Sequence, residues 1–169
     1  MKARHIVTVA VLMAASMLAN AQEQPKAPGL EFAFELKVKC DPAYTVGQTS
    51  HGSRVIIPIV GGTFEGPNIK GTILNGGADY QLVDNAKGRN EIEAIYSIKT
   101  DDDVYIHVRN CGLIVTGKNA DGSPNFYFRT SPKFEAPNDS KYDWLNNSVF
   151  ICDTGFGQGY ILLRVWRVL

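Results

Sequence analysis

The sequence predicts an all-β protein: a closed or nearly closed antiparallel β-barrel of about nine or ten strands, soluble, with one short helical turn. Apolar and polar residues alternate over long stretches, and turn-forming residues recur at short intervals. Only residues 140–146 favour a helical turn. Many short alternating segments separated by turns are typical of antiparallel barrels and sandwiches. We favour a barrel because closure removes exposed strand edges.

The start of the chain has the pattern of a secretory signal peptide. Lys2 and Arg4 precede an apolar stretch, and Ala19 and Ala21 supply the small residues that a signal peptidase reads. We therefore expect residues 1–21 to be removed and the protein to be exported, either to a periplasm or outside the cell. An uncleaved anchor is the alternative, but the apolar stretch is shorter than the roughly 20 residues that span a bilayer.

The rest of the chain forms one predicted domain. Residues 22–29 are polar with two prolines and predict a flexible lead-in, and residues 30–169 form the barrel. The expected strands, in order, are 30–39, 55–60, 69–74, 80–83, 91–100, 104–115, 126–130, 148–152 and 160–168. Asn75-Gly76-Gly77 is typical of a hairpin turn, and Pro58 indicates an edge position or a bulge. The glycine-rich segment 155–159 has strands on both sides, so we expect a turn there and not a phosphate-binding loop.

Composition excludes several classes of function. The 17 basic and 17 acidic residues balance, and no segment clusters Lys or Arg, so nucleic-acid binding is not expected. Beyond the signal peptide only His51 and His107 remain, and we expect no metal site and no cofactor. Three cysteines allow one disulfide in any of three pairings, or none. The oligomeric state is left open.

A membrane-spanning barrel is a third architecture that the length permits. Such a barrel needs an uncharged lipid-facing band on every strand. The last predicted strand carries Arg164 on one face and Arg167 on the other, and strand 55–60 is apolar on both faces. We therefore expect no membrane association after the signal peptide is removed.

Two glycine motifs suggest a site inside the barrel. The paired glycines at 61–62 and 76–77 let the backbone bend or approach another group closely. Strand alternation then places Thr63 with Glu65 on one face, and Asp79 with Gln81 on one face. If these faces point inward, polar groups lie in a partly dry cavity; the alternative is that they face solvent.

A buried pair of acids needs a cation nearby. Arg109 and Arg129 lie within strands, and we expect Glu65 and Asp79 to share a cavity with Arg129, near Trp144. Trp144 either closes one end of the barrel as core or caps the cavity.

The same segments resemble a known family. Residues 58–67, 76–83, 127–135 and 142–146 follow one another as in the DUF3237 family, also called uncharacterised protein family UPF0311. The resemblance covers about residues 30–168. It implies a soluble β-barrel and says little about activity.

We expect the barrel to bind a small, partly apolar organic ligand. The expected ligand-binding residues are Thr63, Glu65, Asp79, Gln81, Tyr96, Arg129 and Trp144. The alternative is a cofactor-independent cyclase, isomerase or lyase. In that enzyme Asp79 or Glu65 acts as general base, and Arg129 or Tyr96 stabilises developing negative charge.

Overall fold

The computed structural model describes residues 25–169. The predicted signal peptide lies outside the described residues. Residues 25–29 are exposed and have no regular secondary structure. None of the helices in residues 25–169 has the length and apolar composition of a membrane span.

The regular secondary structure of the described chain is almost entirely strand, which confirms the predicted fold class. Its ten strands are β1 (Leu30–Cys40), β2 (Tyr44–Thr49), β3 (Gly52–Glu65), β4 (Lys70–Ile73), β5 (Gly77–Asp84), β6 (Arg89–Thr100), β7 (Tyr105–Lys118), β8 (Pro124–Glu135), β9 (Phe150–Gly157) and β10 (Tyr160–Val168). One 3-10 turn, η1 (Asp143–Leu145), falls within the predicted helical turn. The strand β2 was not predicted, because Thr45, Gly47 and Gln48 break the apolar alternation.

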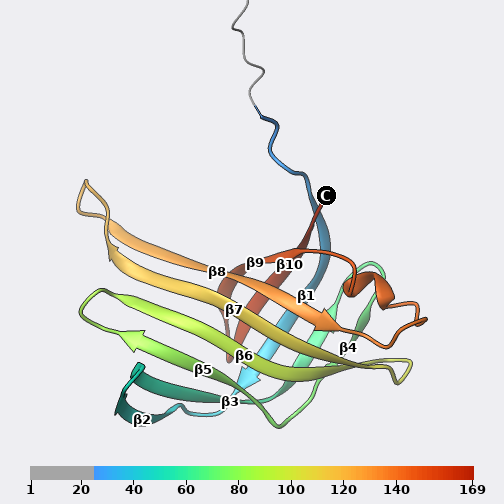
Figure 1. Ribbon diagram of the computed structural model, residues 1–169, viewed down its shortest axis with the longest axis horizontal. Helices are drawn as coiled ribbons and strands as arrows, with labels where there is room; N and C mark the ends of the chain where they lie inside the picture. Colours follow the sequence, from blue (N-terminus) through green and yellow to red (C-terminus); the bar gives the residue numbers. More distant parts are fainter. Residues whose placement is uncertain (1–24) are drawn as a thin grey trace, which may run out of the picture.

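The strands close into one antiparallel barrel (Figure 1). Pairing runs from β1 through β10, β9, β8, β7 and β6 to β4 and β5, and from these two strands to β3, which pairs directly with β1 to complete the circle. The strands β4 and β5 both pair with β3 on one side and β6 on the other, so they lie end to end. They do not pair with each other among the described residues, and the expected hairpin at residues 75–77 is therefore wrong. The residues between Ile73 and Gly77 form a corner that joins β4 to β5, and the two strands together occupy one position in the barrel wall.

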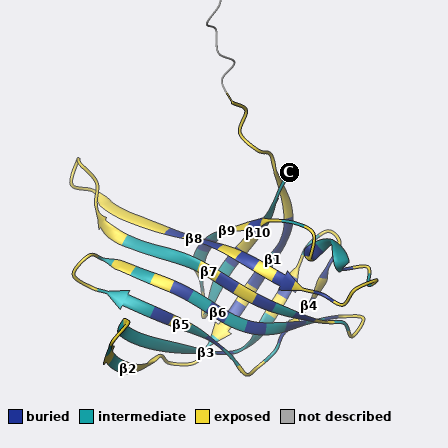
Figure 2. Ribbon diagram, in the orientation of Figure 1, coloured by how far each residue is buried: buried dark blue, intermediate teal, exposed yellow. Residues whose placement is uncertain are grey.

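One half of the barrel is tightly packed. Phe34, Phe64, Phe134 and Phe150 meet there, with ring centroids 5.2 to 6.0 Å apart between neighbours. The turn η1 covers this end, and its Leu145 is almost fully buried. In Figure 2 the buried positions concentrate toward this end of the barrel, and the β7–β8 hairpin at the opposite end is largely exposed. Space for a ligand is therefore found away from η1.

Local irregularities bend the strands. The register between β1 and β3 shifts between the pairs Lys39–Gly61 and Cys40–Ile59, which leaves one extra residue on β3 close to Pro58. This agrees with the bulge that Pro58 indicated. Gly62 has a φ of +134°, and a Cβ there would overlap the carbonyl oxygen of Lys37. The bend at this corner therefore requires glycine.

Candidate functional site

An internal cavity of about 150 Å³ lies in the half of the barrel away from η1. It is lined mainly by apolar side chains, with a few polar groups on β5, β7 and β8. The lining residues are Val38, Cys40, Ile57, Ile59, Asp79, Gln81, Ile92, Ala94, Tyr96, Asn110, Phe128, Thr130, Phe156, Ile161 and Leu163. An apolar chamber with a few placed polar groups is the usual character of a small-molecule site.

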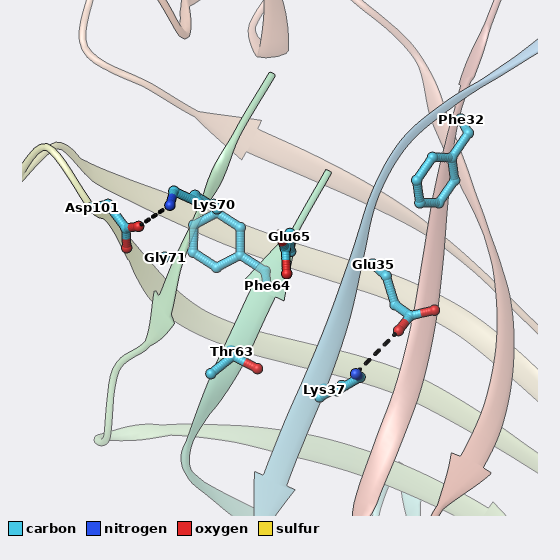
Figure 3. A pocket seen from close by; sticks show the side chains of 9 residues that line it. All are labelled: Phe32, Glu35, Lys37, Thr63, Phe64, Glu65, Lys70, Gly71 and Asp101. Carbon is cyan, nitrogen blue, oxygen red and sulfur yellow. Dashed lines mark ion pairs between the residues drawn. The ribbon is translucent and has the colours of Figure 1, made fainter. Parts of the chain in front are cut away.

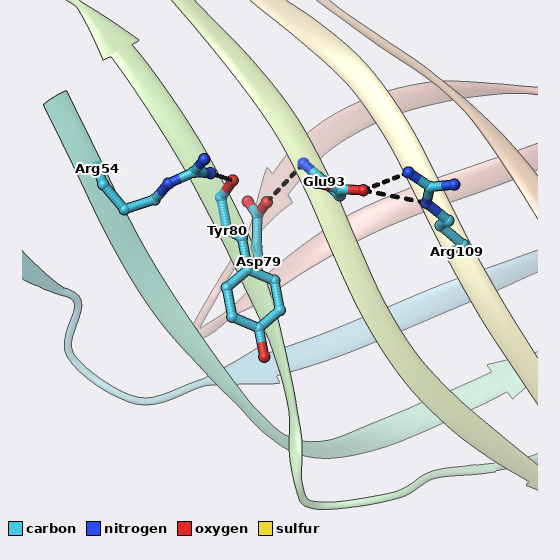
Figure 4. Close-up of polar contacts among 5 residues, drawn as sticks. All are labelled: Arg54, Asp79, Tyr80, Glu93 and Arg109. Carbon is cyan, nitrogen blue, oxygen red and sulfur yellow. Dashed lines mark hydrogen bonds and ion pairs between the residues drawn. The ribbon is translucent and has the colours of Figure 1, made fainter. Parts of the chain in front are cut away.

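The β5–β6 ladder is interrupted next to Asp79, and a backbone N–H freed there binds the Asp79 carboxylate. Regular pairing is present at Asp79–Ala94 and resumes at Leu82–Glu91. Between these points the backbone N–H of Glu93 donates 3.1 Å to Oδ1 of Asp79. The carbonyl of Tyr80 accepts instead from Nη1 of Arg54 at 2.6 Å, as Figure 4 shows.

Gln81 completes the surroundings of the Asp79 carboxylate. Its Nε2 donates 2.6 Å to Oδ2 of Asp79, and its Oε1 accepts a longer bond of 3.4 Å from Nδ2 of Asn90. Burial raises the pKa of Asp79, and the hydrogen bonds from Gln81 and the Glu93 N–H oppose that rise. Asp79 is therefore a carboxyl group that can take up a proton more readily than an exposed aspartate.

Two further polar groups on the cavity wall have unused hydrogen-bonding capacity. Within residues 25–169, Oδ1 of Asn110 is buried without a hydrogen-bond partner, and the buried Oγ1 of Thr130 has no nitrogen or oxygen partner and meets only the weakly hydrogen-bonding thiol of Cys152. Asn110 is 2% exposed and Thr130 is 4% exposed. Unpaired buried polar atoms are costly and few in native proteins, so both are candidates for ligand contact.

Tyr96 and Cys40 also line the cavity. Burial raises the pKa of the Tyr96 hydroxyl far above its usual range, so this phenol stays neutral. Burial likewise raises the pKa of Cys40, and the nearby Asp79 adds to the rise. Neither group is activated as a nucleophile.

Three phenylalanines lie beside the β8–β9 contact, where the strands of the barrel share the fewest paired residues. The β8–β9 ladder has only two residue pairs, Arg129–Asp153 and Thr130–Cys152. Toward the β7–β8 hairpin, Phe126 and Phe128 face Phe156 across the widening gap, with ring centroids 6.0 and 6.1 Å from that of Phe156. Phe156 lines the cavity and is 64% exposed, so it lies at the boundary between cavity and solvent.

The structure separates the residues that were expected to share one site. Asp79, Gln81 and Tyr96 line the cavity. Thr63 and Glu65 are exposed, and they line an open groove at the outer surface together with Lys37 and Lys70 (Figure 3). The expectation that Glu65 faces the cavity is therefore wrong. Alternation was predicted correctly, but β3 is bulged at Val60, just before the first glycine pair. The inward phase of Ile57 and Ile59 therefore does not continue to Glu65.

The two arginines proposed as partners of the buried acid also lie outside. Arg129 pairs with Asp153 at 3.3 Å, and Arg164 joins the same carboxylate at 3.4 Å. Arg109 donates two hydrogen bonds to Glu93, the shorter 2.6 Å. Their position within strands did not show which face they occupy: the inward residues are Val108 and Asn110 on β7, and Phe128 and Thr130 on β8.

Trp144 lies at the closed end, where its ring packs 5.8 Å from that of Phe150. It does not line the cavity, so the core alternative of the sequence analysis is the correct one. Sequence reasoning missed Asn110 and Thr130. It also missed the three phenylalanines beside the β8–β9 contact, Phe126, Phe128 and Phe156. Asn110 could have been found, because it keeps the inward phase set by Ile106 and Val108.

Residues that could hold a metal do not converge in the described structure. Among residues 25–169, no group of three or more His, Cys, Asp or Glu side chains is close enough to bind a metal ion. Cys40, Cys111 and Cys152 all lie in the described part, where none is paired.

The fold and cavity define an antiparallel barrel with an internal, partly polar chamber, and comparison with known proteins gives the family. The model of the DUF3237 family, proteins of unknown function, matches residues 28–168. A UPF0311 protein of Clostridium acetobutylicum is 33% identical over 150 residues, which cover 82% of this chain and 92% of that protein. The chain belongs to the DUF3237 family, as its sequence motifs indicated.

Two other relatives are informative. The crystal structure of a β-barrel-like protein from Acinetobacter baumannii is 34% identical, with a TM-score of 0.76, and the match covers 88% of this chain and 100% of that one. A protein of Penicillium herquei named as a hydroalkoxylation enzyme is 30% identical over 140 residues, 83% of each chain.

Proposed function

We propose that this protein binds a small, partly apolar organic molecule inside its barrel. The observation that carries the proposal is the chamber beside Asp79, where apolar walls meet the polar side chains of Asp79, Gln81, Asn110 and Thr130. A cavity of about 150 Å³ is the size that takes up benzene in an engineered protein interior. The ligand, or the part of it that enters, is therefore about one ring in size.

The proposal is tested by filling the chamber. Ala94 lies in its wall between Asp79 and Asn110, so Ala94→Leu should occupy the space that a ligand needs. Ala78→Leu makes the same change at a buried alanine outside the lining. Both variants should be checked for folding by circular dichroism. Native mass spectrometry and calorimetry with toluene should show binding to wild type and Ala78→Leu, and none to Ala94→Leu. Equal binding to all three proteins would contradict the proposal.

A second candidate is cofactor-independent proton-transfer catalysis at Asp79. It is favoured by the raised pKa of this carboxyl and by the name of the Penicillium relative. In the addition of an alcohol across a double bond, the carboxylate would take the hydroxyl proton as the C–O bond forms, and a proton would be returned to carbon. The product is an isomer of the substrate, so no oxidant or reductant is required.

The catalytic candidate is tested with 2-allylphenol, which carries both reacting groups. Cyclisation followed by NMR should require Asp79, whereas Asp79→Asn should still bind the compound. Equal rates for wild type and Asp79→Asn, or no rate above that of buffer, would remove the catalytic candidate and leave binding.

We also infer that the protein acts outside the cytoplasm, on the strength of the signal-peptide pattern in residues 1–21. N-terminal sequencing of exported protein should give a start at Gln22. Full-length protein retained in the cytoplasm would contradict this inference.

A further inference from the structure

We infer that the cavity selects uncharged ring compounds that carry a hydroxyl group, and that this hydroxyl binds between Asp79, Asn110 and Thr130. The inference rests on the proposed binding function and specifies the chemical class of the ligand. It is carried by two buried polar atoms on the cavity wall, Oδ1 of Asn110 without a partner and Oγ1 of Thr130 with only the Cys152 thiol beside it, and by the absence of basic side chains from the described lining.

The polar groups lie around a shallow patch of the wall. Asp79 pairs with Ala94 across β5 and β6, and Ala94 pairs with Asn110 across β6 and β7. Side chains on one face of neighbouring strands point the same way, so Asp79 and Asn110 flank the single methyl group of Ala94. A ligand group can therefore approach the wall closely between them.

Thr130 extends the same polar patch onto β8. Its cross-strand partner on β7 is Gly112, which has no side chain, two residues from Asn110. No side chain of residue 112 therefore stands between Thr130 and the chamber. A hydroxyl bound here can donate to one group and accept from another, as alcohols and phenols do.

The charges of the wall argue against ionised ligands. Among the described residues that line the chamber, Asp79 is the one carboxylate and there is no Lys, Arg or His. A ligand carboxylate would enter without a counter-charge and close to Asp79. A ligand ammonium could pair with Asp79, but both charges would have to leave water, a cost that the attraction often fails to repay. The raised pKa of Asp79 shows that burial already disfavours charge at this position.

Four probes with the same benzene ring separate these classes: toluene, benzyl alcohol, benzylamine and benzoate. Dissociation constants measured by calorimetry or NMR at pH 7 should be about tenfold lower for benzyl alcohol than for toluene, because two otherwise unpaired groups gain a partner. Benzylamine and benzoate should bind more weakly than benzyl alcohol.

Variants identify the groups responsible. Thr130→Val and Asn110→Leu keep the approximate shape of each side chain and remove its polar atoms. In either variant benzyl alcohol should bind no more than a few-fold more tightly than toluene. Thr154→Val is the matched control, because Thr154 also has a buried, unpaired hydroxyl but does not line the cavity. It should keep the full preference for benzyl alcohol.

The outcomes separate this inference from the proposed function. If toluene binds and benzyl alcohol binds no more tightly, or if benzylamine or benzoate binds best, the inference is wrong and the binding function stands. If the preference for alcohol survives in both Thr130→Val and Asn110→Leu, the assigned groups are wrong. If none of the four probes binds to folded wild-type protein, the proposed function fails as well.

Discussion

The side-chain amide of Gln81 donates a 2.6 Å hydrogen bond to the Asp79 carboxylate, two residues away on the same strand and on the same inner face. The opposite oxygen of Asp79 accepts from the backbone of Glu93. The sheet fixes the Glu93 N–H, and the Gln81 side chain lies beside Asp79 on the same face, so the two bonds engage both oxygens of the carboxyl at the chamber wall.

Asp79 should make the protein less stable as the pH rises. Because burial raises the pKa of Asp79, the folded protein holds the proton more tightly than the unfolded chain, in which the pKa of an aspartate is about 3.9. The stability that protonation provides is therefore present at acidic pH and is lost as the pH rises from about 4 through the raised folded pKa. Urea unfolding from pH 4 to 8 should show wild type losing stability relative to Asp79→Asn. Asp139→Asn, in an exposed turn, should follow wild type; parallel curves for all three proteins would contradict this prediction.

Asp102 should act in the opposite direction. The buried Tyr142 donates a 2.6 Å hydrogen bond to its Oδ1 and Lys141 pairs with it at 2.9 Å. The hydrogen bond from Tyr142 has the larger effect and that from Lys141 the next; together they lower the pKa of Asp102 well below its usual range. The ionised carboxylate therefore stabilises the fold above about pH 4, and this contribution is lost as the pH falls further. Tyr142→Phe should lower the melting temperature at pH 7 more than at pH 3. The same loss at both pH values would show that only packing had changed.

Gly62 should be far less tolerant of alanine than Gly155. A Cβ at Gly62 meets the carbonyl of Lys37 and the residue has positive φ, whereas at Gly155 there is open space and φ is not in that region. We expect Gly62→Ala to lower the free energy of unfolding by about 2–4 kcal/mol, and Gly155→Ala to change it by less than about 0.5 kcal/mol. Chemical denaturation of the two variants gives the comparison. Similar losses at both sites would mean that the corner at β3 relaxes easily.

Phe156 should matter more for ligand retention than for stability. Its ring is mostly exposed and lines the chamber at the weak β8–β9 seam. Phe156→Ala should weaken toluene binding about tenfold, mainly through faster release, and lower stability by less than about 1 kcal/mol. Phe150→Ala, in the packed half, should instead cost about 3–5 kcal/mol. If toluene dissociates from Phe156→Ala no faster than from wild type, ligands do not leave the chamber past Phe156.

The three thiols should react in a fixed order. Cys111 is exposed, Cys40 is partly buried on the cavity wall, and Cys152 is buried with a pKa raised to about 12, chiefly by burial. Iodoacetamide labelling followed by mass spectrometry should modify Cys111 first, Cys40 more slowly, and Cys152 only on unfolding. Saturating toluene should slow labelling of Cys40 and leave that of Cys111 unchanged. Protection of Cys111 by toluene would contradict a cavity site.

Much of the fold could be predicted because its signals are local. Period-two alternation, as in Leu30–Cys40 and Arg89–Thr100, fixes strand type and which residues point together. The glycine-rich segment before Tyr160 joins two paired strands, as predicted, but β9 continues through Gly157 and the turn is confined to Gln158 and Gly159. The β4–β5 corner was misjudged because a turn sequence does not state whether the flanking strands pair with each other or with third strands.

The sequence by itself determined the all-β class, the alternation that places Asp79 and Gln81 on one face, and membership of the family. Only the tertiary structure decided which face is inside. It placed Glu65 and Arg129 on the outer surface, because the β3 bulge shifts one phase and the inward positions of β8 belong to Phe128 and Thr130. It also brought Asn110 and Thr130 to the Asp79 chamber. Their proximity depends on the register between strands far apart in the chain, and local residue preferences carry no record of that register.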